Sequence, residues 1–138
     1  MKTKILVVAV VVTVFALMSA GLLLARDTKE MTYSGWLVDQ LCADAPNSIA
    51  ADGVDLKVNP ELHSLQCALM PPCVASGYGI YIENGSGTYD YIRFNRNGSE
   101  LAEEYLRSIS KENRIAVEVT GRRIGDTIRV KTLSEAVI

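Results

Sequence analysis

Five β-rich runs, with one helical pattern between the third and the fourth, constrain the fold of this chain more than any other feature. The clearest two runs, YGIYIE (78–83) and TYDYIRF (88–94), flank the sequence NGSG. Asn and Gly tolerate the positive φ angles of a hairpin turn, so these two runs are predicted to pair in antiparallel fashion. The other three runs are MTYSGWLV (31–38), RIAVEVTG (114–121) and TIRVKTL (127–133). The last two alternate apolar and polar residues, which indicates strands with one buried face.

Two further segments carry helical signals. The segment SELAEEYLRSI (99–109) has apolar residues at helical spacing, with Ser99 as the predicted N-cap. The segment PELHSLQCALM (60–70) begins with a proline and stops before Pro71-Pro72, which are the bounds expected of a short helix. Residues 43–60 are rich in Pro, Asn, Asp and Gly and are predicted to form an irregular excursion.

This element order predicts a mainly β (β-rich α+β) domain. Five strands with a helix between the third and fourth match a five-stranded antiparallel OB-like barrel with two short helices. Closing the sheet into a barrel removes exposed strand edges, which favours that arrangement for so small a sheet. An open antiparallel sheet with two helices on one side has the same periodicity, so the sequence leaves that alternative open.

The N-terminal segment predicts a location. Lys2 and Lys4 precede an apolar run, residues 5–25, long enough to cross a bilayer as a helix. Residues 1–30 are therefore interpreted as a transmembrane signal-anchor or, if Ser19-Ala20-Gly21 is a cleavage site, as a signal peptide. The lysines place residues 31–138 outside the cytoplasm in both cases. The expected product is a single-pass protein of the cell membrane, or a secreted domain after cleavage.

The charge of the remaining domain argues against nucleic acid as a partner. Residues 1–30 contain four of the 14 Lys and Arg and two of the 16 Asp and Glu, so residues 31–138 carry a formal net charge of −4. The acidic residues are spread along the chain, so the sequence shows no continuous basic stripe. A phosphate-binding footprint would need such a stripe.

Three stretches together resemble a known group of proteins. GWLVDQLC, HSLQCALMPPCVASGYGIYI and RIAVEVTGRRIGDTIRVKTL are similar to segments of small exported bacterial Cys/His-containing OB-like domains of uncharacterised function. Gly35, Asp39 and Cys42 match the opening motif, and a His with two Cys matches the middle one. The five residues between Cys67 and Cys73 depart from the spacing of the group. The resemblance implies an exported OB-like fold and no reaction.

The only His and all three Cys suggest a metal site. On a helix His63 and Cys67 would project from one face, and the proline pair would turn Cys73 back toward it. With Cys42 these residues supply the four ligands of a tetrahedral Zn²⁺ site, and the thiolates also suit Cu(I). Two alternatives stay open. One is a disulfide that leaves one thiol free, as expected outside the cytoplasm, and the other is inert buried cysteines.

A second candidate site is aromatic. Tyr81 on one predicted strand and Tyr89, Tyr91 and Arg93 on the next could form a groove for a small ligand, where OB folds often present stacking platforms. Cross-strand tyrosine pairing on a half-exposed face is the simpler interpretation.

These patterns favour a binding module over an enzyme. No motif supplies the orienting partner and oxyanion site that Cys-His catalysis requires, and Cys67 is not at a helix N-terminus that would activate it. The sequence therefore predicts a membrane-tethered extracytoplasmic binding module that holds a metal ion. A disulfide-braced structural or interaction accessory of the cell envelope is the alternative, followed by a thiol-dependent enzyme. The expected partners are the membrane and an unidentified small ligand or envelope protein.

Overall fold

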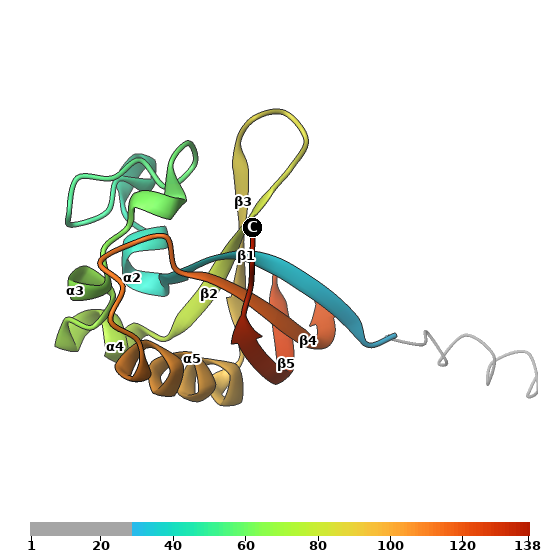
Figure 1. Cartoon of the computed structure of the whole chain (residues 1–138). Helices are drawn as coiled ribbons and strands as arrows, with labels where there is room; N and C mark the ends of the chain where they lie inside the picture. Colours follow the sequence, from blue (N-terminus) through green and yellow to red (C-terminus); the bar gives the residue numbers. More distant parts are fainter. Residues whose placement is uncertain (1–28) are drawn as a thin grey trace, which may run out of the picture.

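Each of the five strands pairs with two neighbours, so the sheet closes on itself in the order β1-β2-β3-β5-β4 (Figure 1). The computed structural model describes residues 29–138. The five-stranded, mainly β class is confirmed. The strands are β1 (Met31–Asp39), β2 (Tyr78–Glu83), β3 (Tyr89–Phe94), β4 (Ala116–Ile124) and β5 (Thr127–Glu135).

The prediction of a wholly antiparallel sheet is wrong at one pair. Strands β3 and β5 run parallel, with Phe94 opposite Ile128, whereas the other four pairs are antiparallel. The reason is one of parity, because strand direction cannot alternate all the way around a ring of five. One pair in such a ring has to be parallel.

Glycines with positive φ angles form the turns of the two hairpins, and the predicted antiparallel pairing of β2 with β3 is confirmed. Gly85 and Gly87 between β2 and β3 have φ angles of 81° and 79°. Gly125 between β4 and β5 has a φ of 62°. These left-handed conformations cost glycine little and cost other residues more.

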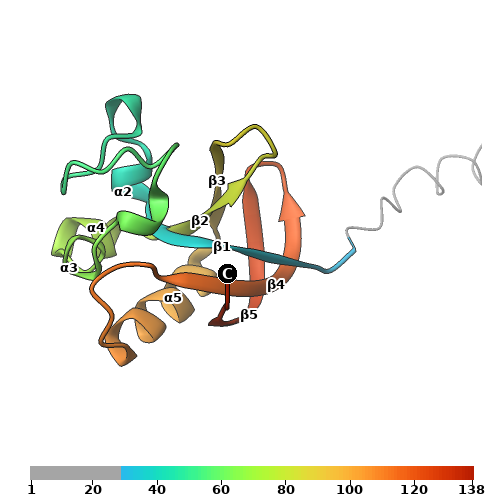
Figure 2. The same cartoon turned by 45° about the horizontal axis from the view of Figure 1, so that its top comes forward.

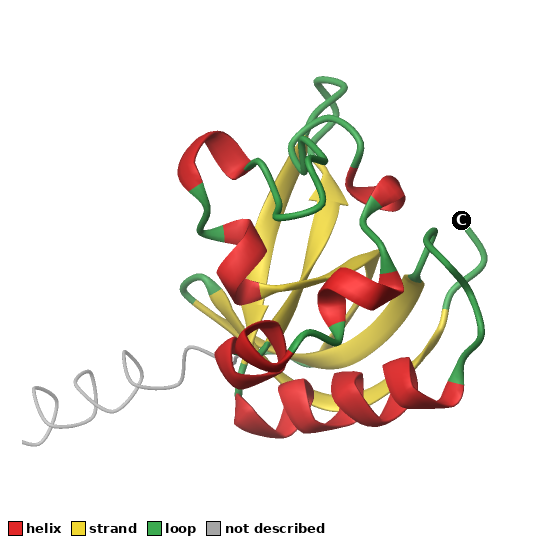
Figure 3. Cartoon of the chain, turned by 90° about the vertical axis from the view of Figure 1, so that its left-hand side faces the viewer, coloured by secondary structure: helices red, strands yellow, loops and turns green. Residues whose placement is uncertain are grey.

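Helix α5 (Arg96–Ser108) is the long helix that lies along the sheet in Figure 3, and its N-cap is four residues earlier than predicted. Its N-cap is Asn95, whose side chain accepts hydrogen bonds from the backbone N–H groups of Gly98 and Val130. Ser99, the predicted cap, lies inside the helix, and its hydroxyl oxygen instead accepts a hydrogen bond from the backbone N–H of Tyr78. Asn95 satisfies one amide of the helix and one of β5, so it fixes the helix against the sheet.

The predicted helix over residues 60–70 is broken. Its place is taken by a 3-10 turn, η2 (Pro60–Leu62), and a short helix, α3 (Leu65–Ala68), with His63 extended between them. The proline pair does not end a helix but starts one, α4 (Pro71–Ser76), since proline is favoured at the first helical positions. The remaining short pieces, α2 (Gln40–Ala43) and η1 (Pro46–Ser48), follow β1. Short helical pieces are thus more numerous than the two expected.

The apolar residues form two separate clusters. The first lies between the sheet and α5 and includes Ile80, Leu106 and Val117. The second joins the excursion to β1 and β2, and it includes Leu56, Tyr81 and all three cysteines. Figure 2 shows this excursion at one end of the barrel, with the β4–β5 hairpin beside the start of β1 at the other. The three candidate cysteine ligands therefore belong to a small core of their own.

Residues 1–28 of the predicted signal-anchor or signal peptide, including its whole apolar run, lie outside the described residues. Within residues 29–138 the structure contains no helix that is long and apolar enough to span a bilayer.

Candidate metal centre

The end of β1 positions the first functional side chains. Asp39 is the N-cap of α2, and its Oδ1 accepts a hydrogen bond of 2.9 Å from the backbone N–H of Cys42. A cap residue that accepts from an amide three positions later is a common way to start a helix. Asp39 is fully buried, and Cys42 is buried beside it.

His63 lies between two carboxylates. Its Nε2 is 3.1 Å from Oδ2 of Asp39, close enough for a hydrogen bond. Its Nδ1 is 3.0 Å from Oδ2 of Asp52, but no hydrogen bond joins them, and Nδ1 is a buried nitrogen without a hydrogen-bond partner in the described part of the chain. Asp52 instead accepts from the backbone N–H and the hydroxyl of Ser64. One ring nitrogen is held by Asp39, and the other faces the Asp52 carboxylate without forming a hydrogen bond to any described residue.

The sulfur atoms have the separation that a shared metal requires. The Sγ atoms of Cys42 and Cys67 are 3.8 Å apart, and all three cysteines are free thiols. Two sulfurs at about 2.3 Å from a tetrahedral Zn²⁺ ion would be about 3.8 Å apart. A disulfide would require a much closer approach, about 2.05 Å. The observed spacing matches an edge of a metal tetrahedron.

Within residues 29–138 the donors form two overlapping groups. Ligand atoms of Cys42, His63 and Cys67 lie within 4.8 Å of one another, and so do those of Asp39, Cys42 and Cys73. Cys42 belongs to both groups. The structure thus brings three of the four predicted ligands together directly and places the fourth, Cys73, beside Cys42 and Asp39.

Hydrogen bonds keep Asp39 ionised in this buried position. Burial on its own would raise the pKa of the carboxyl group. The hydrogen bonds from His63 and from the Cys42 amide, together with the His63 charge, outweigh burial and hold the pKa of Asp39 below its ordinary value. A carboxylate beside a histidine is the usual outer partner that orients a metal-binding imidazole.

The thiols, in contrast, favour their protonated forms. Burial raises the pKa of Cys42 well above its ordinary value, and burial together with the Asp39 charge raises the pKa of Cys73 to about 12. Burial also raises the pKa of Cys67. A protonated, buried thiol is a poor nucleophile. The arrangement therefore suits a soft cation, whose charge replaces the thiol protons, better than thiol catalysis.

A surface pocket gives access to one side of this cluster. Its volume is about 220 Å³, and it is lined by Ala51, Asp52, Ser64, Gln66, Cys67 and Met70. Cys67 is the cluster sulfur that forms part of its wall. An ion can thus approach the sulfurs from solvent on the Cys67 side.

The predicted aromatic site is largely committed to internal contacts. Tyr81 is buried, and its ring packs on that of Tyr91 with centroids 4.9 Å apart. The Tyr91 hydroxyl donates to the carbonyl of Val38. Arg93 donates to the side chains of Gln40 and Asp44. Tyr89 is half-buried. A ligand groove on this face stays a prediction.

Two carboxylates of the site were not predicted from sequence. Asp39 was noted only as part of a motif, although a D-x-x-C spacing at a strand end could have indicated an N-cap beside a candidate ligand. Asp52 lies in the irregular excursion, where no periodicity indicates which side chain turns inward.

Comparisons with known proteins do not add a functional assignment. A scan of family models, a search of curated proteins and a search of solved structures each found no match to this chain.

Proposed function

We propose that this protein is a membrane-tethered extracytoplasmic binding module whose OB-like barrel supports a buried metal centre. The ligands are Cys42, His63 and Cys67, with Cys73 as the fourth, and Asp39 orients the imidazole. The bound ion is Zn²⁺ or Cu(I), the cations best suited to two or three thiolates and one imidazole.

One observation carries the metal proposal. Buried ligand atoms of Cys42, His63 and Cys67, from three separate segments, lie within 4.8 Å of one another, with a sulfur–sulfur distance of 3.8 Å. The Nδ1 atom of His63 supports it, because this buried atom faces the Asp52 carboxylate at 3.0 Å and forms no hydrogen bond among the described residues, which leaves it available to a cation.

The barrel and the tether rest on different observations. The closed strand order with one parallel pair, and a helix between β3 and β4, supports the OB-like description. The apolar run at 5–25, preceded by lysines, supports the membrane anchor and the extracytoplasmic side. These features also agree with the resemblance to exported OB-like domains.

The second candidate function is a disulfide-braced accessory of the cell envelope. The three cysteines are members of the small apolar cluster beneath the excursion, where they contribute packing without any ion. Oxidation of Cys42 with Cys67 would tie α2 to α3, and an oxidising compartment favours such pairing.

Metal content and thiol count separate the two functions. The full-length chain is purified anaerobically in mild detergent, loaded with Zn²⁺ or Cu(I), and analysed by mass spectrometry, elemental analysis and thiol titration. The metal centre requires one bound ion per chain and, after the metal is removed, three free thiols. One disulfide with one free thiol, and no metal after loading, would contradict it and support the accessory function.

Substitution with Co²⁺ tests the geometry as well as the binding. A tetrahedral site with thiolate ligands gives intense visible d–d bands and sulfur-to-cobalt charge transfer. Replacement of His63 by Gln should alter both the d–d bands and the charge-transfer band. Replacement of the exposed Gln66 by Ala, beside Cys67 in sequence, should leave the spectrum unchanged.

A further inference from the structure

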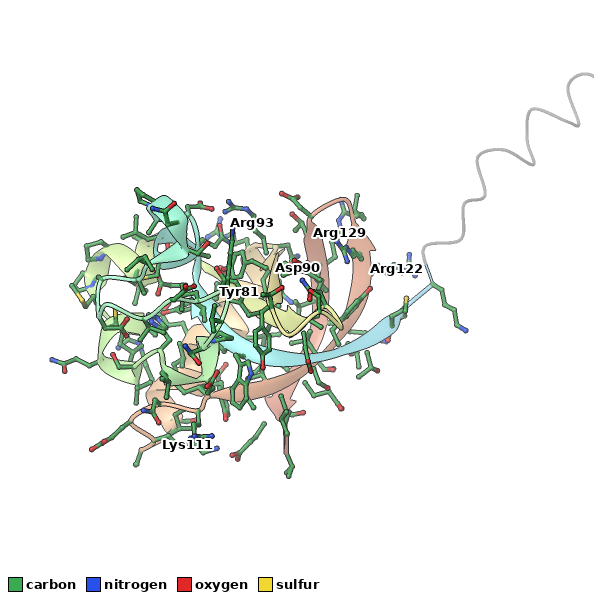
Figure 4. The ribbon with its side chains drawn as sticks, turned by 90° about the horizontal axis from the view of Figure 1, so that it is seen from above. Tyr81, Asp90, Arg93, Lys111, Arg122 and Arg129 are labelled. Carbon is green, nitrogen blue, oxygen red and sulfur yellow. The ribbon has the colours of Figure 1, made fainter. Side chains whose placement is uncertain are left out.

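A cluster of basic side chains lies where β4 and β5 approach the start of β1. Arg122 on β4 is directly opposite Arg129 on β5, and Lys131 is two residues further along β5 (Figure 4). Gly121, the neighbour of Arg122, pairs with Met31, the first residue of β1. Arg122, Arg129 and Lys131 are all exposed, and they are named the basic patch here.

The fold itself does not account for the basic patch. Like charges directly opposite each other on neighbouring strands are destabilising. Among the residues that the structure describes, Arg122 and Arg129 form no ion pair, and Lys131 pairs only with Glu30, at 3.3 Å. Together with Glu30 and Gly121 these side chains line a depression of about 380 Å³. An unbalanced cluster around a depression is suited to an anion from outside the domain.

The length of the preceding chain places the basic patch near any anchor. The apolar run ends at Ala25, six residues before Met31. Six residues span at most about 20 Å even when fully extended. A membrane anchor at 5–25 would therefore hold this end of the barrel close to the lipid headgroups. Two exposed apolar side chains at the same end, Met31 and Ile124, suit the headgroup boundary.

We propose that the basic patch docks the domain on anionic phospholipid headgroups of the leaflet in which the chain is anchored. The inference rests on the membrane anchor of the proposed function. Phosphodiester oxygens accept paired hydrogen bonds from guanidinium groups, and Arg122 and Arg129 offer two such groups side by side. Docking by this end orients the excursion, with its metal centre, away from the bilayer (Figure 1).

The test measures how close the basic patch lies to the lipid. The full-length chain with Trp36→Phe and Ile124→Trp carries one tryptophan reporter beside the basic patch. It is reconstituted in nanodiscs with dansyl-labelled headgroups, made from neutral lipid with or without phosphatidylglycerol. Energy transfer should be higher in the anionic discs and should fall as salt is added, because screening shortens the reach of the charges.

Charge-neutral variants make the test specific. Each basic side chain at an anionic surface changes the docking equilibrium about fivefold, so Arg122→Gln, Arg129→Gln and Lys131→Gln together should weaken it about a hundredfold. The same number of charges removed at Lys57, Arg96 and Arg114 should leave the transfer unchanged. A reporter at Val58→Trp, on the excursion, should show low transfer in both kinds of disc.

The outcomes distinguish docking from anchoring. Equal transfer in neutral and anionic discs, or no effect of the three basic-patch substitutions, would overturn the docking inference while the anchor stands. If the chain does not enter neutral discs, the anchor fails. In that case the docking inference is supported only if the chain binds anionic discs in a salt-sensitive way and the three substitutions abolish this binding. If the chain shows no such binding, the docking inference is overturned.

Discussion

Asp39 combines a structural and an electrostatic role in one buried side chain. One carboxylate oxygen caps α2 and the other accepts from His63. Replacement by Asn keeps an oxygen for the cap but removes the charge that orients the imidazole. Metal affinity should fall about 10- to 100-fold, the usual cost of losing an outer-sphere partner. Competition with a chromophoric chelator measures the change.

A matched variant gives the control for Asp39. Asp90→Asn removes the same charge from the exposed face of β3, away from the sulfurs, and should leave the affinity unchanged. Equal affinities for Asp39→Asn and the unmodified chain would contradict the role of the carboxylate. A loss far beyond 100-fold would place Asp39 among the ligands rather than behind one.

The three cysteines should not respond equally to substitution. Cys42 belongs to both donor groups, whereas Cys67 and Cys73 each belong to one. Cys42→Ser should therefore abolish Co²⁺ charge-transfer absorption, while Cys67→Ser and Cys73→Ser should each leave a weaker, shifted spectrum. Absorption spectra of the three variants at the same cobalt concentration test this order. A spectrum that survives Cys42→Ser would contradict the shared-ligand arrangement.

At the scale of elements, Gly98 controls how closely α5 packs on the sheet. A Cβ atom at this position would lie 2.5 Å from Val130 Cγ2 and 2.9 Å from Phe94 Cβ. Gly98→Ala gains about 1 kcal/mol of helix propensity but overpacks the contact by about 1–3 kcal/mol, so a net loss of stability is expected. Urea unfolding measures it. Glu104→Ala, on the exposed side of the same helix, is the control and should not destabilise the domain.

Local patterns predicted most of the elements because these elements obey local rules. The run at 78–83 forms β2 with the predicted bounds, since its β-rich composition and the Gly-containing turn that follows indicate a strand without reference to distant contacts. The helix at 60–70 could not be predicted correctly in the same way. The Asp52 carboxylate accepts a hydrogen bond from the backbone N–H of Ser64, and the Asp39 carboxylate is hydrogen-bonded to the His63 ring. These two long-range contacts break the helix there. Periodicity carries no information about such contacts.

In the candidate site, too, some features could be predicted from local sequence and others depend on distant contacts. The soft donors could be found by composition, because the chain contains one His and three Cys. Their separation into two groups around Cys42 depends on how the excursion folds against β1. That arrangement follows from the packing of Leu56, Tyr81 and the cysteines, which the sequence does not indicate.

For the whole molecule, buried tyrosines set the alkaline limit of stability. Burial raises the pKa values of Tyr78 and Tyr81 above the ordinary value of 10.0, so the folded state keeps protons that the unfolded chain releases. These groups leave stability unchanged below about pH 10 and reduce it as pH rises further. The expected slope is about 1.4 kcal/mol per pH unit for each such group, and the buried thiols act in the same direction.

Urea midpoints at several alkaline pH values measure this limit. Tyr78→Phe is the matched variant, because it removes one titrating group and the hydrogen bond to Ala68. It should lower stability at neutral pH but flatten the alkaline decline. A midpoint that stays constant or rises between about pH 10 and 11 would contradict the assignment.

The ring of strands also determines when the domain can finish folding. Strand β1 comes first in the chain, yet Met31 pairs with Gly121 on β4, and β5 must lie beside β3 before the circle is complete. Contacts so distant in sequence form late and slowly. During synthesis, β1 therefore keeps an unpaired edge until β4 has emerged, and pulse proteolysis should detect this exposed intermediate.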